Sequence, residues 1–129
     1  MMKLSGGVVA AGMRLLGMRV LRLTTVGAKT GQSRTVTLGW FPDGDNAWLV
    51  VASFGGSAKH PAWYVNLAKN PDKVWIEVNG RRVKVRPVSL KGNERADVWR
   101  RITTAAPNYA TYQANTDREI PVVRLTPAE

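Results

Sequence analysis

The dipeptide Asn79-Gly80 separates two stretches, residues 73–79 and 82–89, in which apolar and polar side chains alternate. Alternation with a period of two is typical of a strand with one buried face. Asn-Gly readily adopts the left-handed backbone that a two-residue hairpin turn requires. The pattern therefore predicts two neighbouring antiparallel strands, and it limits the fold to classes that contain antiparallel sheet.

The rest of the chain also divides into short elements. We predict strands over residues 33–40, 47–53 and 121–125, and helical segments over residues 61–69, 93–106 and 109–115. The stretch 47–53 is almost entirely apolar, which indicates burial on both faces. Strands and helices do not alternate regularly, so a doubly wound parallel sheet is disfavoured. We predict a small, partly open β-barrel with helices packed outside.

The N-terminal segment has a helical pattern. Apolar residues recur at spacings of three and four on one stripe, whose members are Val9, Met13, Leu16, Val20 and Leu23. We predict an amphipathic helix over residues 1–20, although residues 20–25 fit a first strand equally well. The stripe suits either a helix that packs on the core or a basic helix that lies on an anionic membrane.

Length and composition narrow the class of protein. A chain of 129 residues is expected to form a single domain, because neither half would bury an adequate core. There is no cysteine and only one histidine, so no metal site is predicted. The apolar stretch 8–23 is interrupted by arginines and lacks a clear cleavage site. We therefore expect neither a secretory signal nor a membrane span, and a cytoplasmic protein.

Charge points to an anionic partner. Lysine and arginine total 19 against nine acidic residues, which gives a net charge of +10. Such an excess attracts nucleic acid, an anionic membrane or a phosphorylated ligand. The segment 27–34 (GAKTGQSR) combines two glycines with hydroxyl groups, Lys29 and Arg34. It fits a phosphate-binding loop, and it fits a basic surface hairpin equally well.

A second candidate site follows the apolar stretch, over residues 53–66. Ser53 ends the strand, Gly55 and Gly56 allow close backbone approach, and a helix begins soon after. Trp63 and Asn66 share one helical face, which suits a planar heteroaromatic ligand. Tryptophan also commonly caps a core, so the pattern has a structural interpretation as well. We interpret His60, which precedes a proline, as a structural group.

Three segments resemble the deazaflavin-dependent nitroreductase and F420H2-dependent quinone reductase family of actinobacteria. They are residues 23–36, residues 53–67 with Asn70-Pro71, and a C-terminal segment that comprises residues 107–113 and 116–122. The resemblance runs from about residue 21 to the end of the chain. It implies a split β-barrel akin to barrels that bind flavin mononucleotide. It also implies coenzyme F420, an 8-hydroxy-5-deazaflavin with a phospholactyl-polyglutamate tail.

The resemblance also implies roles for individual residues. Lys29, Thr30 and Arg34 would bind the phosphate and tail of the coenzyme. The ring and ribityl chain would contact Thr35, Val36, Thr37, Leu38, Gly39, Val51, Ala52, Ser53, Phe54, Ala62, Trp63 and Asn66. Tyr109 and Tyr112 would cover the open face of the deazaflavin, where the acceptor binds. Ser53 or Tyr109 would stabilise the charge that develops there.

The implied function is that of an oxidoreductase. Hydride would pass from F420H2 to a quinone, a conjugated enone or a nitroaromatic compound, with no nucleic acid as partner. The N-terminal helix would allow peripheral contact with the inner face of the plasma membrane, and the oligomeric state is open. Departures from the family at Ala28, Thr30, Thr37 and Ala106 bear on the choice of acceptor. Two alternatives remain: a barrel that binds flavin mononucleotide or haem, and a basic module that binds nucleic acid.

Overall fold

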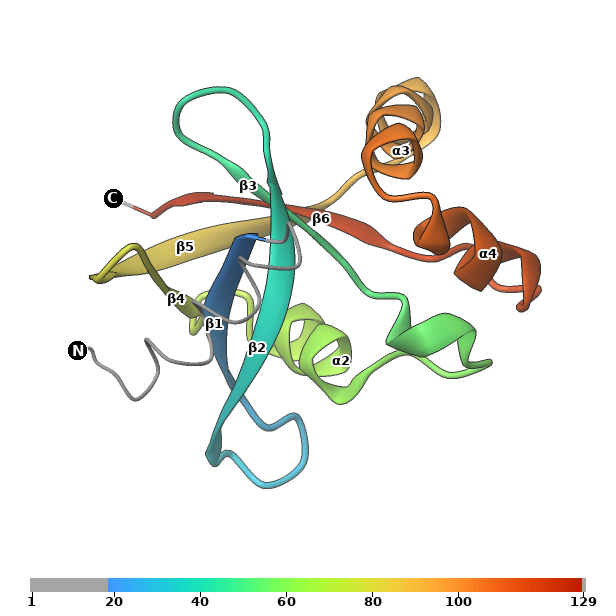
Figure 1. The fold of residues 1–129 in the computed structure, drawn as a ribbon. Helices are drawn as coiled ribbons and strands as arrows, with labels where there is room; N and C mark the ends of the chain where they lie inside the picture. The colour runs from blue at the N-terminus through green and yellow to red at the C-terminus, as the bar shows by residue number, and fades with distance from the viewer. Residues whose placement is uncertain (1–18, 129) are drawn as a thin grey trace.

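The computed structural model describes residues 19–128, in which six antiparallel strands close into a barrel (Figure 1). The strands are β1 (Arg19–Val26), β2 (Ser33–Pro42), β3 (Trp48–Val51), β4 (Trp75–Val78), β5 (Arg81–Ser89) and β6 (Val122–Pro127). Around the barrel they follow the order β1-β2-β3-β6-β5-β4. The predicted barrel is confirmed, and so is the hairpin, because Asn79 and Gly80 join β4 to β5 with φ angles of 52° and 78°.

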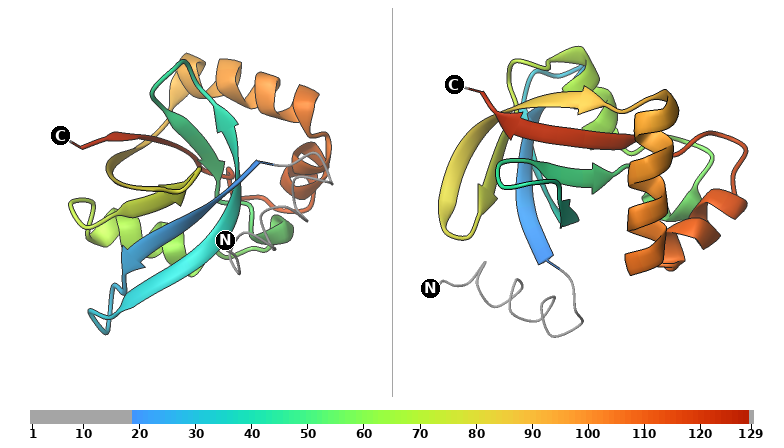
Figure 2. Two further views of the ribbon diagram at one scale, coloured as in Figure 1. Left: turned by 60° about the vertical axis from the view of Figure 1, so that its left-hand side comes forward. Right: turned by 90° about the horizontal axis from the view of Figure 1, so that it is seen from above.

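Within residues 19–128, three helices pack outside the barrel. They are α2 (Ala62–Lys69), α3 (Gly92–Ala105) and α4 (Asn108–Ala114), and a short 3-10 turn, η1, spans Phe54–Gly56. Figure 2 shows α3 and α4 together on one side of the barrel. Among the described residues, no helix is long and apolar enough to cross a membrane.

Strand β1 corrects one prediction. Arg19 and Val20 pair with Trp40 and Gly39 of β2, so a helix that reaches residue 20 is wrong at these two positions, and the strand interpretation of residues 20–25 holds. Leu21 and Leu23 are buried in the barrel, whereas Arg22 between them is exposed. The barrel thus buries this segment with a period of two, and strand pairing overrides the helical spacing. The remainder of the predicted helix, residues 1–18, lies outside the described residues.

Strand β3 lies between two hydrophobic clusters. Trp48 and Val50 point into the barrel, where α2 contributes Trp63 and Leu67. Leu49 and Val51 belong to a second cluster, which lies under α3 and α4. All four residues of β3 are therefore buried, as its apolar sequence predicts.

The barrel is split beside β2. Along its first eight residues β2 pairs with β1, but with β3 it forms only the pairs Phe41–Leu49 and Pro42–Trp48. Residues 33–40 therefore have no strand partner on the β3 side within the described chain. Beyond Val51 the chain turns away through η1 into α2. The gap leaves one side of the barrel open to a ligand.

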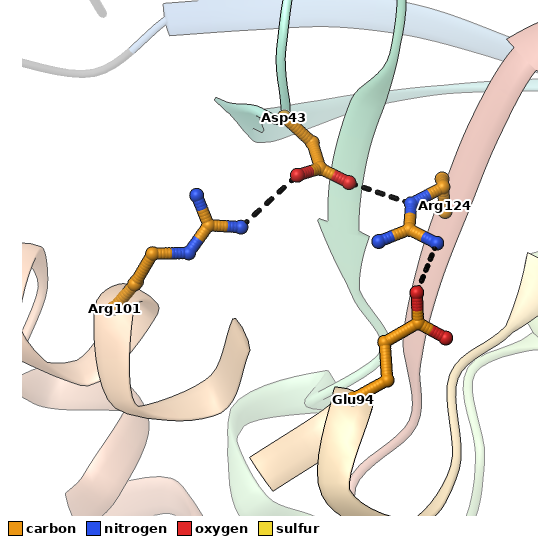
Figure 3. Close-up of polar contacts among 4 residues, drawn as sticks. All are labelled: Asp43, Glu94, Arg101 and Arg124. Atoms are coloured by element: carbon orange, nitrogen blue, oxygen red, sulfur yellow. Dashed lines mark hydrogen bonds and ion pairs between the residues drawn. The ribbon is translucent and has the colours of Figure 1, made fainter. Parts of the chain in front are cut away.

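An ion-pair network holds the β2–β3 turn against α3 and β6 (Figure 3). Asp43 accepts hydrogen bonds from Arg124 Nε at 2.6 Å and from Arg101 Nη2 at 3.1 Å. Arg124 also donates to Glu94 at 2.7 Å. Burial acts to raise the pKa of the Asp43 carboxyl, but the bonds from Arg124 and Arg101 outweigh it, so the pKa lies below its usual value.

We expect Asp43→Asn to lower the free energy of unfolding at pH 7 by about 1–2 kcal/mol, because two charge-assisted bonds are weakened and Arg101 is partly exposed. Since the folded pKa is depressed, the carboxylate's contribution is present above the ordinary pKa of 3.8 and is lost as pH falls through the folded value. Urea unfolding should therefore show the difference shrinking below pH 4. Asp97→Asn, in an exposed pair with Arg100, is the control. A difference that stays constant between pH 7 and pH 3 would contradict the assignment.

Candidate active site

A cavity of about 850 Å³ lies at the open side of the barrel. Its walls are the free edge of β2, the turn before β2, the segment that follows β3, the start of α2 and one residue of α4. This volume is typical of a site for a small molecule or cofactor. The two sequence segments singled out above, 27–34 and 53–66, both contribute to it.

The cavity brings together most of the residues that the resemblance implied. Those that line it are Lys29, Thr30, Arg34, Thr35, Val36, Thr37, Leu38, Gly39, Val51, Ser53, Phe54, Ala62, Trp63, Asn66 and Tyr109. Six further residues line the cavity, and five of them lie in the candidate segments 27–34 and 53–66; the six are Thr25, Gly27, Ala28, Gly55, Pro61 and Val65. Only Thr25 of β1 lies outside both segments, and sequence reasoning assigned it no role.

Two expected residues do not line the cavity. Ala52 is fully buried among the barrel residues, because the alternation of β3 continues and turns it inward. Tyr112 packs edge-to-face on Tyr109, with ring centroids 5.6 Å apart. Tyr112 therefore contacts Tyr109, which lines the cavity, but does not line the cavity itself.

The turn between β1 and β2 is held by its own hydrogen bonds. The N–H of Gly27 donates to Gln32 O at 2.7 Å, and the N–H of Gly31 donates to Gly27 O at 3.0 Å. A Cβ on Gly27 would lie 2.7 Å from Thr30 Oγ1, so a side chain there would displace Thr30. The N–H of Gln32 donates to Thr30 Oγ1, which leaves the hydroxyl proton of Thr30 available. The glycines thus shape the turn, and their N–H groups are not directed at an anion.

Asn66 connects this turn to α2. Its Oδ1 accepts the N–H of Ala28 at 2.9 Å, and its Nδ2 donates to Thr25 Oγ1 at 3.2 Å. Asn66 and Thr25 are 7% and 1% exposed, so the bond between them is buried, whereas the bond to Ala28 is partly buried. In the structure, the amide of Asn66 is therefore engaged in positioning the turn.

Positive charge collects at this end of the cavity. Lys29 and Arg34 line it, and both side chains are exposed. Neither has an acidic partner within 4.0 Å among residues 19–128. An anionic group bound here would meet two cations and the Thr30 hydroxyl.

The opposite end of the cavity is aromatic and apolar. Tyr109 is 9% exposed, and its ring packs edge-to-face on Phe41 at 5.9 Å. Burial, with a smaller contribution from Tyr112, raises the pKa of the Tyr109 phenol, so the hydroxyl is protonated at neutral pH and can donate. Phe54 and Val65 also line the cavity, and they are 60% and 47% exposed. They form an apolar lip beside the site.

Arg118 is the polar residue near the site that sequence reasoning missed. It lies between α4 and β6, and it donates hydrogen bonds to the carbonyl groups of Ala52, Ser53 and Ser57. Its Nη1 also lies 3.1 Å from Nδ1 of His60, and the ring of His60 packs on Tyr64 at 4.9 Å. Burial and the charge of Arg118 lower the pKa of His60, which agrees with a structural role. No spacing in the sequence relates residue 118 to residues 52–60.

Fold and cavity together define a class of protein. It is a split β-barrel with a site that is basic at one end and aromatic at the other, suited to a planar ligand that carries an anionic group.

Comparisons with known proteins identify the family. The family model for F420H(2)-dependent quinone reductase matches residues 1–127, and the chain belongs to this family. It is 46% identical over 109 residues to an F420H(2)-dependent quinone reductase of Mycobacterium tuberculosis, which covers 82% of this chain and 72% of that protein. A solved structure of the F420-H2 dependent reductase FDR-A is similar, with a TM-score of 0.72 and 37% identity over 82% of this chain and 92% of that one.

A more distant likeness concerns the fold alone. HutZ, a haem storage protein of Vibrio cholerae, has a TM-score of 0.62 at 13% identity and covers 99% of this chain and 92% of its own. The split barrel is therefore shared by proteins with different ligands. The ligand of this protein has to be inferred from the residues of its site and not from its fold.

We expect Asn66→Leu, which is close in size, to lower the free energy of unfolding by about 1–3 kcal/mol, because the N–H of Ala28 loses its partner in a partly buried position. The turn that carries Lys29 should also lose its fixed position, so affinity for F420 should fall. Thermal unfolding and coenzyme fluorescence titration measure the two effects. Lys69→Ala, an exposed change in the same helix, should alter neither. Wild-type affinity in a destabilised Asn66→Leu variant would remove Asn66 from the positioning of the turn.

Proposed function

We propose that this protein binds reduced coenzyme F420 in the cavity beside β2 and catalyses transfer of its hydride to a quinone. The observation that carries the proposal is that one cavity has, at one end, two cations without an acidic partner among residues 19–128 and, at the other, a protonated phenol. Membership of the F420H2-dependent quinone reductase family supports the same conclusion.

The residues present fit F420. Its phosphate and polyglutamate tail are anionic, and Lys29, Arg34 and the Thr30 hydroxyl offer charge and donors without competing acidic groups among the described residues. The planar ring needs a flat, largely apolar slot, which Val36, Leu38 and Trp63 supply. In the described chain, residues 33–40 pair with β1 but not with β3. Their N–H and C=O groups on the β3 side are therefore available to bond the polar edge of the ring.

When bound, the reduced deazaflavin supplies the hydride, and the protein supplies position and electrostatics. The clamp of Lys29, Thr30 and Arg34 would fix the tail and so set the depth of the ring in the slot. Tyr109 would cover the ring and hold the acceptor, and its hydroxyl would donate to the acceptor oxygen on which negative charge develops. The Ser53 hydroxyl is a second donor on the cavity wall.

We further propose that the acceptor site also takes other planar electrophiles, such as nitroaromatic compounds and conjugated enones. The exposed lip of Phe54 and Val65 favours acceptors with an apolar part, because that part would cover both side chains. Peripheral membrane contact through residues 1–18 is a proposal from the sequence pattern, since these residues lie outside the described part of the chain.

A direct test mixes the protein with F420H2 and a panel of quinones, enones and nitroaromatic compounds, and follows coenzyme oxidation. We expect turnover with quinones and none with reduced flavin mononucleotide as donor. Lys29→Ala and Arg34→Ala should each weaken F420H2 binding roughly fivefold, about 1 kcal/mol, because both cations are exposed and partly screened. The loss should be smaller for a coenzyme fragment without phosphate and tail. Turnover with flavin but not with F420H2 would refute the proposal.

Tyr109→Phe isolates the role of the hydroxyl, because the ring that packs on Phe41 and Tyr112 is kept. We expect kcat for quinone to fall by roughly tenfold or more with little change in affinity for F420H2. Tyr109→Ala should lower kcat further, and Tyr112→Ala should reduce turnover more than coenzyme affinity. The matched control is Tyr64→Phe, whose hydroxyl bonds Ser89 away from the cavity and which should cost stability alone. Unchanged kcat in Tyr109→Phe would exclude the phenol as a donor.

A further inference from the structure

Arg118 binds three carbonyl groups of one short segment. Its Nη2 donates to Ser53 O at 2.8 Å, its Nε to Ser57 O at 2.8 Å and its Nη1 to Ala52 O at 3.2 Å. Arg118 does not line the cavity, whereas Ser53, Phe54 and Gly55 do. The guanidinium therefore holds this segment from the side that faces away from the cavity.

The segment adopts an unusual backbone. Phe54, Gly55 and Gly56 follow one another with φ angles of 46°, 63° and 82°, all in the left-handed region. A phenylalanine there is strained, and such a conformation persists only where the surroundings impose it. The turn's own bonds are few, from the N–H of Gly56 to Ser53 O and from the N–H of Ser57 to Phe54 O. Arg118 binds the carbonyls on both sides of the strained turn and so helps to hold it, together with α4, which packs on Gly56.

The same contacts orient two N–H groups. In a planar trans peptide the N–H points opposite to the carbonyl of the same unit. The carbonyls of Ala52 and Ser53 point to Arg118, so the N–H groups of Ser53 and Phe54 point away from it, toward the side of the cavity. Neither N–H has a hydrogen-bond partner among residues 19–128. A cation on the carbonyl oxygen also polarises the peptide and strengthens its N–H as a donor.

We propose that Arg118 is a positioning residue that presents the N–H groups of Ser53 and Phe54 to the acceptor oxygen. The inference rests on the proposed function, which supplies F420H2 as reductant. A quinone that gains a hydride becomes a hydroquinone monoanion, and one proton from solvent completes the hydroquinone. The donor loses the hydride and releases one proton, so atoms and charge balance. The two N–H groups would stabilise the monoanion oxygen as it forms.

The experiment compares Arg118→Met, Arg118→Lys and the control Arg95→Met. Arg95 likewise donates to a backbone carbonyl, that of Ile120 at 2.6 Å, and is buried, whereas Arg118 is half-buried. The partners of Arg95 in the described structure, Ile120, Glu119 and Trp99, do not line the cavity. Amide hydrogen exchange of the ligand-free proteins is measured first. Protection of the Gly56 and Ser57 N–H groups should fall at least tenfold in Arg118→Met, less in Arg118→Lys and not in Arg95→Met.

Steady-state kinetics with F420H2 and a quinone form the second measurement. We expect kcat to fall roughly tenfold to a hundredfold in Arg118→Met, with partial recovery in Arg118→Lys and a change of less than threefold in coenzyme affinity. Arg95→Met should keep the wild-type kcat. Should Arg118→Met not fold, Arg118→Lys carries both measurements, because it keeps a cation but cannot bind all three carbonyls.

Each arm can overturn the proposal. Unchanged protection of Gly56 and Ser57 in the Arg118 variants would show that other contacts hold the turn. Reduced protection with wild-type kcat would show that the oriented N–H groups do not assist the acceptor. A wild-type protein that does not oxidise F420H2 would refute the proposed function, and the exchange measurement would still decide whether Arg118 positions the turn.

Discussion

The interrupted pairing of β2 is the constraint on which the site depends. Its first eight residues pair with β1, but only Phe41 and Pro42 pair with β3, so the barrel wall opens where a continuous sheet would leave no room. The turn before β2 and the segment after β3 form walls of the cavity at this gap. An open edge exposes backbone groups that can bond a ligand, so a ligand bound here would take the place of the missing strand partner.

Side chains from distant parts of the sequence hold the two loop walls of the cavity. Asn66 of α2 binds the turn that carries Lys29 and Thr30, through Ala28 and Thr25. Arg118 binds the segment that carries Ser53 and Phe54. Each wall is a loop, and loops define a binding geometry only when other groups restrict them. The Asp43 network does the same for the β2–β3 turn, where the split begins.

Much of the fold was predictable from local signals. The Asn79-Gly80 turn, the alternating strands that flank it and the wholly apolar β3 each follow from residue order alone, since neighbouring residues decide turn chemistry and the period of burial. The helical stripe misled at Arg19 and Val20, because spacings of three and four in a short apolar segment also allow a strand, and pairing with β2 decided the outcome. Most cavity-lining positions came from the family resemblance, whereas Ala52 turned inward.

By itself, the sequence determined the antiparallel class and supplied a cationic segment, 27–34, and aromatic residues that suit a planar, anionic ligand. The tertiary structure alone decided which polar groups remain free for that ligand. The N–H of Ala28 is taken by Asn66, 38 positions away, and the carbonyls of Ala52 and Ser53 are taken by Arg118, more than 60 positions away. A hydrogen bond requires its donor and acceptor to lie close in space. For residues this far apart in the sequence, only the tertiary fold brings the two atoms together, and no periodicity along the chain predicts the pair.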